Sequence, residues 1–180
     1  MYRRLDNRLS LREIKELCAD IISARADRND LWIALHSDND RIAVNALWIM
    51  THLPADQAEW LYSIRQPLID MLLSESHPSK RRLILQILRE QEYTADDIPT
   101  DLLDYCLSRI NAECEPYAVR CFSLYTAYKM CRHYPELLNE LQEHLHLLAT
   151  QPLSPGLRSA YRQITHRLDR LTRINNRKSR

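Results

Sequence analysis

The sequence predicts an all-α fold, an α-α superhelix of about four stacked helical hairpins preceded by an N-terminal capping helix. Three observations lead to this prediction: a pattern that recurs at a nearly constant step, a second helical segment before each recurrence, and a single glycine in 180 residues. A constant step of this size is typical of repeated helical units, each of which buries its apolar face only against its neighbours.

The clearest recurring segment is EPYAVRCFSLYTAYKM, residues 115–130. Pro116 is tolerated in the first turn of a helix, where its missing N–H has no intrahelical partner, and Glu115 places a carboxylate at the positive end of the helix dipole. Residues from Val119 to Met130 then recur at helical spacing on one side. The segment is therefore predicted to be a helix with one packing face.

The same arrangement appears three more times along the chain. Residues 39–43 lead into NALWIM, residues 77–82 lead into LILQIL, and residues 154–158 lead into SAYRQI. The equivalent positions, separated by 39, 38 and 38 residues, are Ile42, Arg81, Val119 and Leu157. A leucine-rich segment precedes each recurrence, at residues 31–35, 68–73, 102–107 and 137–141. Each unit of roughly 40 residues is thus predicted to contain two helices.

Two helices in a unit of this length resemble the HEAT-like helical repeat family of the ARM-type α-solenoid fold. The resemblance covers about residues 29–173 and includes a Val-Arg pair at Val119-Arg120 and, more loosely, Leu157-Arg158. Arg81 departs from the pattern by placing a charge where an apolar residue is usual. The resemblance implies a solenoid whose second helices line the concave surface.

The expected domain organisation is a single HEAT-like domain over residues 10–174, flanked by a flexible N-terminus, 1–9, and a basic flexible tail, 175–180. Ser10 and Glu13 form a capping-box pattern that opens the N-terminal capping helix. Pro67 falls inside an otherwise helical run, so we expect a break near Arg65 and Gln66.

Composition excludes several classes of site. Phosphate-cradling loops, dinucleotide fingerprints and the nucleophile elbow all need two or more glycines, and the chain has only Gly156. The five cysteines contain no C-x-x-C pair, which indicates reduced thiols and no metal site. No apolar run is long enough to span a bilayer. We therefore expect a cytoplasmic protein that is not an enzyme and has no cofactor, no membrane contact and no small-molecule substrate.

The charge is unevenly distributed along the sequence. Residues 158–180 carry a net charge of +7, and the preceding 157 residues carry −6. The basic end could contact phosphates or an acidic partner. The alternative is a charged, solvated outer face of an end repeat, since no aromatic residues interleave the cations on their face of the helix. The candidate contact residues are Arg158, Arg162, Arg170, Arg173, Arg177 and Lys178.

The repeat register places Trp48, Ile87, Tyr125 and Gln163 at equivalent positions on successive second helices. Because second helices line the concave side in the family, this ladder could form a partner-binding groove. Packing between repeats is the alternative, and the apolar Ile87 favours it. The candidate partner-binding residues are Asn45, Trp48, His52, Phe122, Tyr125 and Lys129.

Three functions follow from these observations. The first is a non-catalytic scaffold that binds another macromolecule, most often a protein, through its second helices. The second is nucleic-acid binding through the basic C-terminal helix. The third is a DNA glycosylase of the alkylation-repair type, an enzyme family with HEAT-like repeats and a concave basic groove. Its catalytic aspartate matches no position here, so no catalytic residue is carried over.

Overall fold

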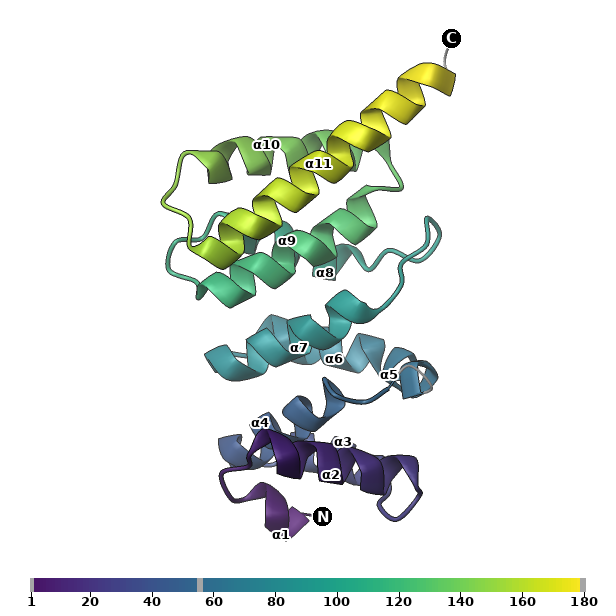
Figure 1. The fold of residues 1–180 in the computed structure, drawn as a ribbon, viewed down its shortest axis with the longest axis vertical. Coiled ribbons are helices and arrows are strands. Elements are labelled where there is room, and N and C mark those ends of the chain that lie inside the picture. Colours follow the sequence, from purple (N-terminus) through teal and green to yellow (C-terminus); the bar gives the residue numbers. More distant parts are fainter. Residues whose placement is uncertain (1, 55–56, 179–180) are drawn as a thin grey trace. The chain divides into compact units, whose positions relative to one another are not determined.

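The computed structural model describes residues 2–54 and 57–178. Side chains are described for residues 3–54 and 57–171. The described residues form eleven α-helices and no strand. The predicted all-α class is therefore confirmed. By its internal contacts the chain divides into two compact units, unit 1 at Met1–Gln91 and unit 2 at Glu92–Arg180. Figure 1 shows the helices of each unit packed in pairs.

Unit 1 contains two helix pairs and the helices that precede them. The pairs are α3 with α4 and α6 with α7, and the second helices α4 and α7 pack against each other. Helices α1 and α2 also contact α4. The helices are α1 (Tyr2–Leu5), α2 (Leu11–Ile22), α3 (Asn29–Leu35), α4 (Asp40–Met50), α5 (Ala58–Ser63), α6 (Arg65–Ser74) and α7 (Pro78–Glu90).

Unit 2 consists of two longer helix pairs. Helix α8 pairs with α9, and α10 pairs with α11. The second helices, α9 and α11, again pack on each other, and α10 also contacts α8 and α9. The helices are α8 (Thr100–Ile110), α9 (Tyr117–Cys131), α10 (Pro135–Ala149) and α11 (Pro155–Lys178).

The repeat step predicted from the sequence is present in the structure. The second helices begin at Asp40, Pro78, Tyr117 and Pro155, so each equivalent position is the third or fourth residue of its helix. Ile42, Val119 and Leu157 are buried there, whereas Arg81 is half-buried. An apolar side chain at this point anchors the first turn against the neighbouring helices. Arg81, the one charged residue among the four equivalent positions, is therefore also the most exposed of them.

A capping box and two buried leucines stabilise the N-terminal part of unit 1. The Ser10 hydroxyl accepts a hydrogen bond from the Glu13 N–H at 3.3 Å, and the Glu13 carboxylate accepts one from the Ser10 N–H at 2.8 Å, so the expected capping box is present. The hydrogen bonds from Ser10 lower the pKa of Glu13. Residues 2–9, which we expected to be flexible, form α1 and a short segment after it; Leu5 at the end of α1 and Leu9 in that segment are buried.

The expected break before Pro67 lies at Ile64, between α5 and α6. Pro67 is the third residue of α6, a position whose N–H has no intrahelical acceptor. At the other end of the chain, α11 extends to Lys178, through most of the segment that we expected to be a flexible tail, and residues 179–180 lie outside the described part.

Candidate interaction surface

In unit 1, helix α4 leaves one side only partly covered. Arg41 is exposed, and Val44, Trp48 and His52 are half-buried; these residues follow one another at helical spacing. The His52 Nδ1 lies 2.9 Å from the Trp48 carbonyl oxygen, and the two rings meet edge to face with centroids 6.2 Å apart. This contact holds the Trp48 and His52 side chains beside each other at the end of α4.

Asn45, on the same helix, has a different environment from its predicted neighbours. Its side chain is buried, and its Nδ2 donates to the carbonyl oxygens of Leu5 at 2.8 Å and Asn7 at 2.9 Å. The Asn45 amide therefore fastens the N-terminal segment onto α4. An open hollow of about 450 Å³ adjoins this contact and is lined by Arg8, Leu9, Arg41, Val44, Asn45 and Trp48.

In unit 2, helix α9 carries the second part of the predicted surface. Phe122, Tyr125 and Lys129 are half-buried, whereas Ser123 and Thr126, which follow Phe122 and Tyr125 in the sequence, are fully buried. The structure therefore brings these three predicted residues onto one side of α9. At the other ladder positions, Ile87 on α7 is buried and Gln163 on α11 is exposed, so the four positions differ in their surroundings.

A carboxylate from the chain itself lies at the C-terminal end of this side of α9. The Lys129 Nζ is 3.2 Å from Glu92 Oε1, and the Arg132 Nη2 is 3.5 Å from Glu92 Oε2. The Glu92 side chain is 75% exposed. The sequence did not indicate this cluster, because Glu92 and Lys129 are 37 residues apart.

Helix α11 buries its predicted apolar stripe and exposes its cations. Leu157, Ile164 and Leu168 are buried, and Tyr161 and Leu171 are half-buried. The predicted contact residues with described side chains, Arg158, Arg162 and Arg170, are all exposed. The side chains of Arg173, Arg177 and Lys178 lie outside the described residues.

One cation of α11 that the sequence prediction omitted makes a specific contact with α9. The Arg167 guanidinium carbon lies 5.7 Å from the ring centroid of Tyr128, a cation–π arrangement. Arg167 itself is exposed, and Tyr128 is buried beside it. This contact ties the two second helices of unit 2, α9 and α11, to each other.

The charges of unit 2 divide between its first and second helices. Among the described side chains, exposed or half-buried, the first helices α8 and α10 carry five acids, Asp101, Asp104, Glu136, Glu140 and Glu143, with one arginine, Arg109. In the same part of the chain, the second helices and the residue directly after α9 carry one acid, Asp169, with six cations, Lys129, Arg132, Arg158, Arg162, Arg167 and Arg170. Within the described part of unit 2, the acids therefore gather on the first helices and the cations on the second helices and directly after α9.

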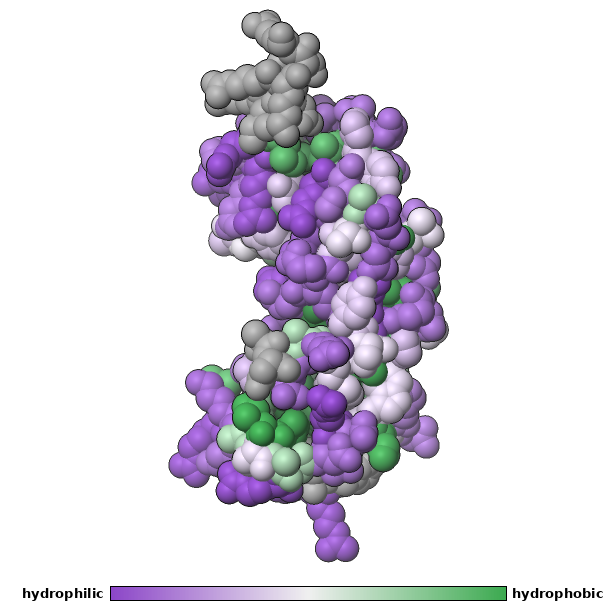
Figure 2. Space-filling view, turned by 90° about the vertical axis from the view of Figure 1, so that its right-hand side faces the viewer, coloured by the Kyte–Doolittle hydropathy of each residue, from purple (hydrophilic) through white to green (hydrophobic). Residues whose placement is uncertain are grey.

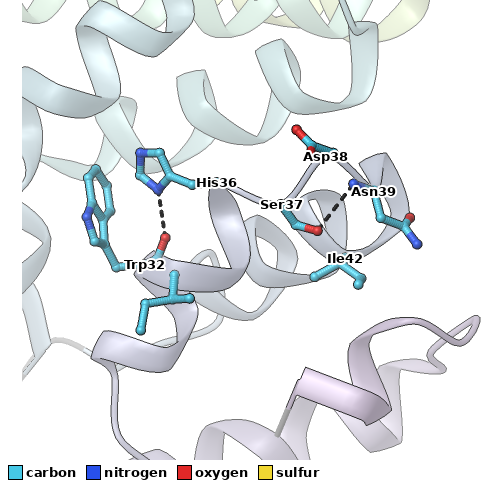
Figure 3. A pocket seen from close by; sticks show the side chains of 7 residues that line it. Trp32, His36, Ser37, Asp38, Asn39 and Ile42 are labelled. Atoms are coloured by element: carbon cyan, nitrogen blue, oxygen red, sulfur yellow. Dashed lines mark hydrogen bonds between the residues drawn. The ribbon is translucent and has the colours of Figure 1, made fainter.

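A further hollow, of about 780 Å³, lies where α3 meets the start of α4 in unit 1 (Figure 3). Trp32 and His36 stand side by side on α3, with ring centroids 4.5 Å apart, and the His36 Nδ1 is 2.8 Å from the Trp32 carbonyl oxygen. Ile33 on the same wall is 63% exposed. This hollow adjoins a first helix, whereas the predicted ladder lies on the second helices.

Figure 2 shows mostly hydrophilic side chains over the visible face of unit 2 and a group of hydrophobic ones on unit 1, in the lower part of the view. Among the described residues, no group of three or more His, Cys, Asp or Glu side chains is placed to hold a metal ion. None of the helices in the described ranges is both long and apolar enough to cross a bilayer.

Comparison with known proteins gives one match. A family model for the HEAT repeat domain matches residues 1–168. The match begins at residue 1, so it includes the N-terminal segment that lay outside the resemblance seen in the sequence. Neither a search of curated proteins nor a search of solved structures gave a match. Since the family model covers most of the chain and the fold is built of packed helix pairs, the chain belongs to the HEAT repeat domain family.

Proposed function

We propose that this protein is a non-catalytic scaffold that binds a protein partner through the surface of its second helices. HEAT repeats form repeat scaffolds that commonly mediate protein interactions, so membership of this family supports the proposal. The observation that carries the finer proposal is the partly covered side of α4 and of α9. Aromatic side chains lie on both, Trp48 on α4 and Phe122 and Tyr125 on α9.

Aromatic residues beside cations suit a protein interface. Tyr, Trp and Arg are enriched where partners make their main contacts, since they combine a large apolar area with a polar group. On α4, Trp48 has His52 and Arg41 on the same side, and on α9, Tyr125 has Lys129 one turn away. The second helices therefore supply candidate anchors in each unit.

Site-specific photo-crosslinking in the cells that produce the protein tests this proposal. A benzoylphenylalanine at position 125 or 48 replaces one half-buried aromatic residue by another, and the matched control places it at Leu147, an exposed position on the first helix α10. We expect a specific crosslinked protein from 125 or 48 and none from 147. Crosslinks formed equally well from 147, or from no second-helix position, would contradict the proposal.

A further inference from the structure

Three cations lie around the C-terminal end of α9 in unit 2. Lys129 follows Tyr128 in the chain, Arg132 lies one turn beyond it, and Arg167 of α11 stands over the Tyr128 ring at 5.7 Å. We call Lys129, Arg132 and Arg167 the cation cluster. Its members come from two helices that pack on each other, so the spacing between them is set by the fold.

A carboxylate of the chain itself contacts two members of the cation cluster, Lys129 and Arg132. Glu92 places one carboxylate oxygen 3.2 Å from Lys129 and the other 3.5 Å from Arg132. An ion pair with so exposed a carboxylate contributes little to folding, because water screens the charges and the side chains lose conformational freedom. The Glu92 side chain, which is 75% exposed, is therefore readily replaced by another carboxylate.

Apolar contacts lie next to the cation cluster. Tyr125 precedes Lys129 by one turn on the same side of α9, and Phe122 lies close to Tyr125 along that side. A partner segment that follows α9 would thus meet aromatic surface and then cations. With the proposed function as its basis, this arrangement defines the kind of segment that fits.

We propose that the second-helix surface of unit 2 binds an acidic protein segment, whose carboxylates contact Lys129, Arg132 and Arg167, and that Glu92 occupies part of this position in the free protein. Charge complementarity supports this partner, because the exposed or half-buried charges on the described parts of α9 and α11, together with Arg132 directly after α9, are six cations and one acid. The contacts of Glu92 show how one carboxylate group can bridge Lys129 and Arg132.

An acidic protein segment fits this surface better than a nucleic acid. Nucleic-acid-binding domains are strongly basic overall, with an isoelectric point above about 9, whereas this chain has a value near 7.7. Phe122 and Tyr125 are also half-buried, so their rings are not open platforms for stacked bases.

Fluorescence anisotropy with the full chain tests the inference. The probe is a labelled Glu/Asp-rich peptide of about eight residues, enough in extended form to cover the ~22 Å length of α9. A Lys-rich peptide of the same length, a single-stranded DNA and a duplex serve as comparison probes. We expect the acidic peptide to bind most tightly and its affinity to fall between about 50 and about 200 mM salt.

Two sets of variants locate the binding. Arg132→Glu with Arg167→Glu should weaken acidic-peptide binding by about tenfold or more, whereas Arg12→Glu, at an exposed arginine of unit 1, should leave it nearly unchanged. Glu92→Gln should strengthen binding by about two- to fivefold, because it removes the competing carboxylate. Its control, Glu136→Gln, makes the same change of charge on α10 and should have little effect.

Each contrary result has a definite meaning. Tighter binding of either DNA probe, abolished by the same Arg132 and Arg167 reversals, would replace the acidic segment by nucleic acid. Failure of the acidic peptide to bind, or binding that ignores Glu92→Gln and the double reversal, would overturn the inference. Crosslinking from position 125 to a partner region without acidic residues would also overturn it while leaving the proposed function standing.

Discussion

Arg120 offers the sharpest test of how unit 2 is held together. Its side chain is only 2% exposed, and it reaches from the start of α9 to two other parts of the unit. The Nε donates to the Ile110 carbonyl oxygen, at the end of α8, at 2.9 Å, and the Nη2 donates to Gln151 Oε1, just after α10. Gln151 in turn donates to the Asn111 carbonyl oxygen at 3.1 Å. One guanidinium thus joins the ends of three helices.

Replacing Arg120 by alanine removes both hydrogen bonds and leaves a cavity. Each bond from a charged donor contributes about 1.5–3 kcal/mol, partly offset because the buried charge is no longer desolvated. The two acceptors lose their partner, and the lost side-chain volume adds a packing cost. We expect a total loss of about 3–5 kcal/mol in the free energy of unfolding. Arg120→Met keeps most of the side-chain volume and should lose about 1–3 kcal/mol.

Urea unfolding followed by far-ultraviolet circular dichroism measures this effect. With a slope of about 2 kcal/mol/M, Arg120→Ala should lower the unfolding midpoint by about 1.5–2.5 M, and the exposed control Arg162→Ala by no more than about 0.25 M. All three tryptophans lie in unit 1, so their fluorescence follows that unit separately. An Arg120→Ala midpoint equal to that of the control would refute the proposed role of the buried guanidinium.

Three further predictions concern other parts of the chain. Asn45→Ala removes both hydrogen bonds to the N-terminal segment, so the free energy of unfolding should fall by about 1–3 kcal/mol and residues 3–9 should be less protected from hydrogen exchange. Unchanged exchange in residues 3–9 would contradict this prediction. Burial raises the pKa of the Cys131 thiol to about 12. A thiol reagent near neutral pH should therefore modify exposed Cys114 and leave Cys131 unmodified until the protein unfolds. Equal rates of modification at the two cysteines would refute this prediction. The hydrogen bond from Lys80, with Nζ 2.6 Å from the Asp40 carboxylate, lowers the pKa of Asp40 below its ordinary 3.8. The ionised form favours the folded state, so this stabilisation is present above pH 3.8 and is lost as pH falls through the lower folded value. Between about pH 5 and about pH 3 the melting temperature should therefore fall less in Asp40→Asn than in the unaltered protein, and parallel curves would disprove the link.

The sequence alone determined the features that depend on neighbouring residues. The step of 38 or 39 residues, the helix pairs, the Ser10 capping box and the break before Pro67 are local patterns of apolar spacing, capping and backbone geometry, and the structure contains all of them. The apolar stripe of α11 could be assigned from its spacing for the same reason.

Tertiary structure decided which polar residues are buried and which charges meet. Arg120 and Gln151 are 31 residues apart, Glu92 and Lys129 are 37 apart, and Asn45 holds a carbonyl 40 residues away. Helical periodicity places a residue on a side of its own helix, but contacts of this kind also depend on how separate helices and loops pack. For that reason Asn45, predicted at a binding surface, holds the N-terminal segment instead, and the cation cluster was visible only in the folded unit.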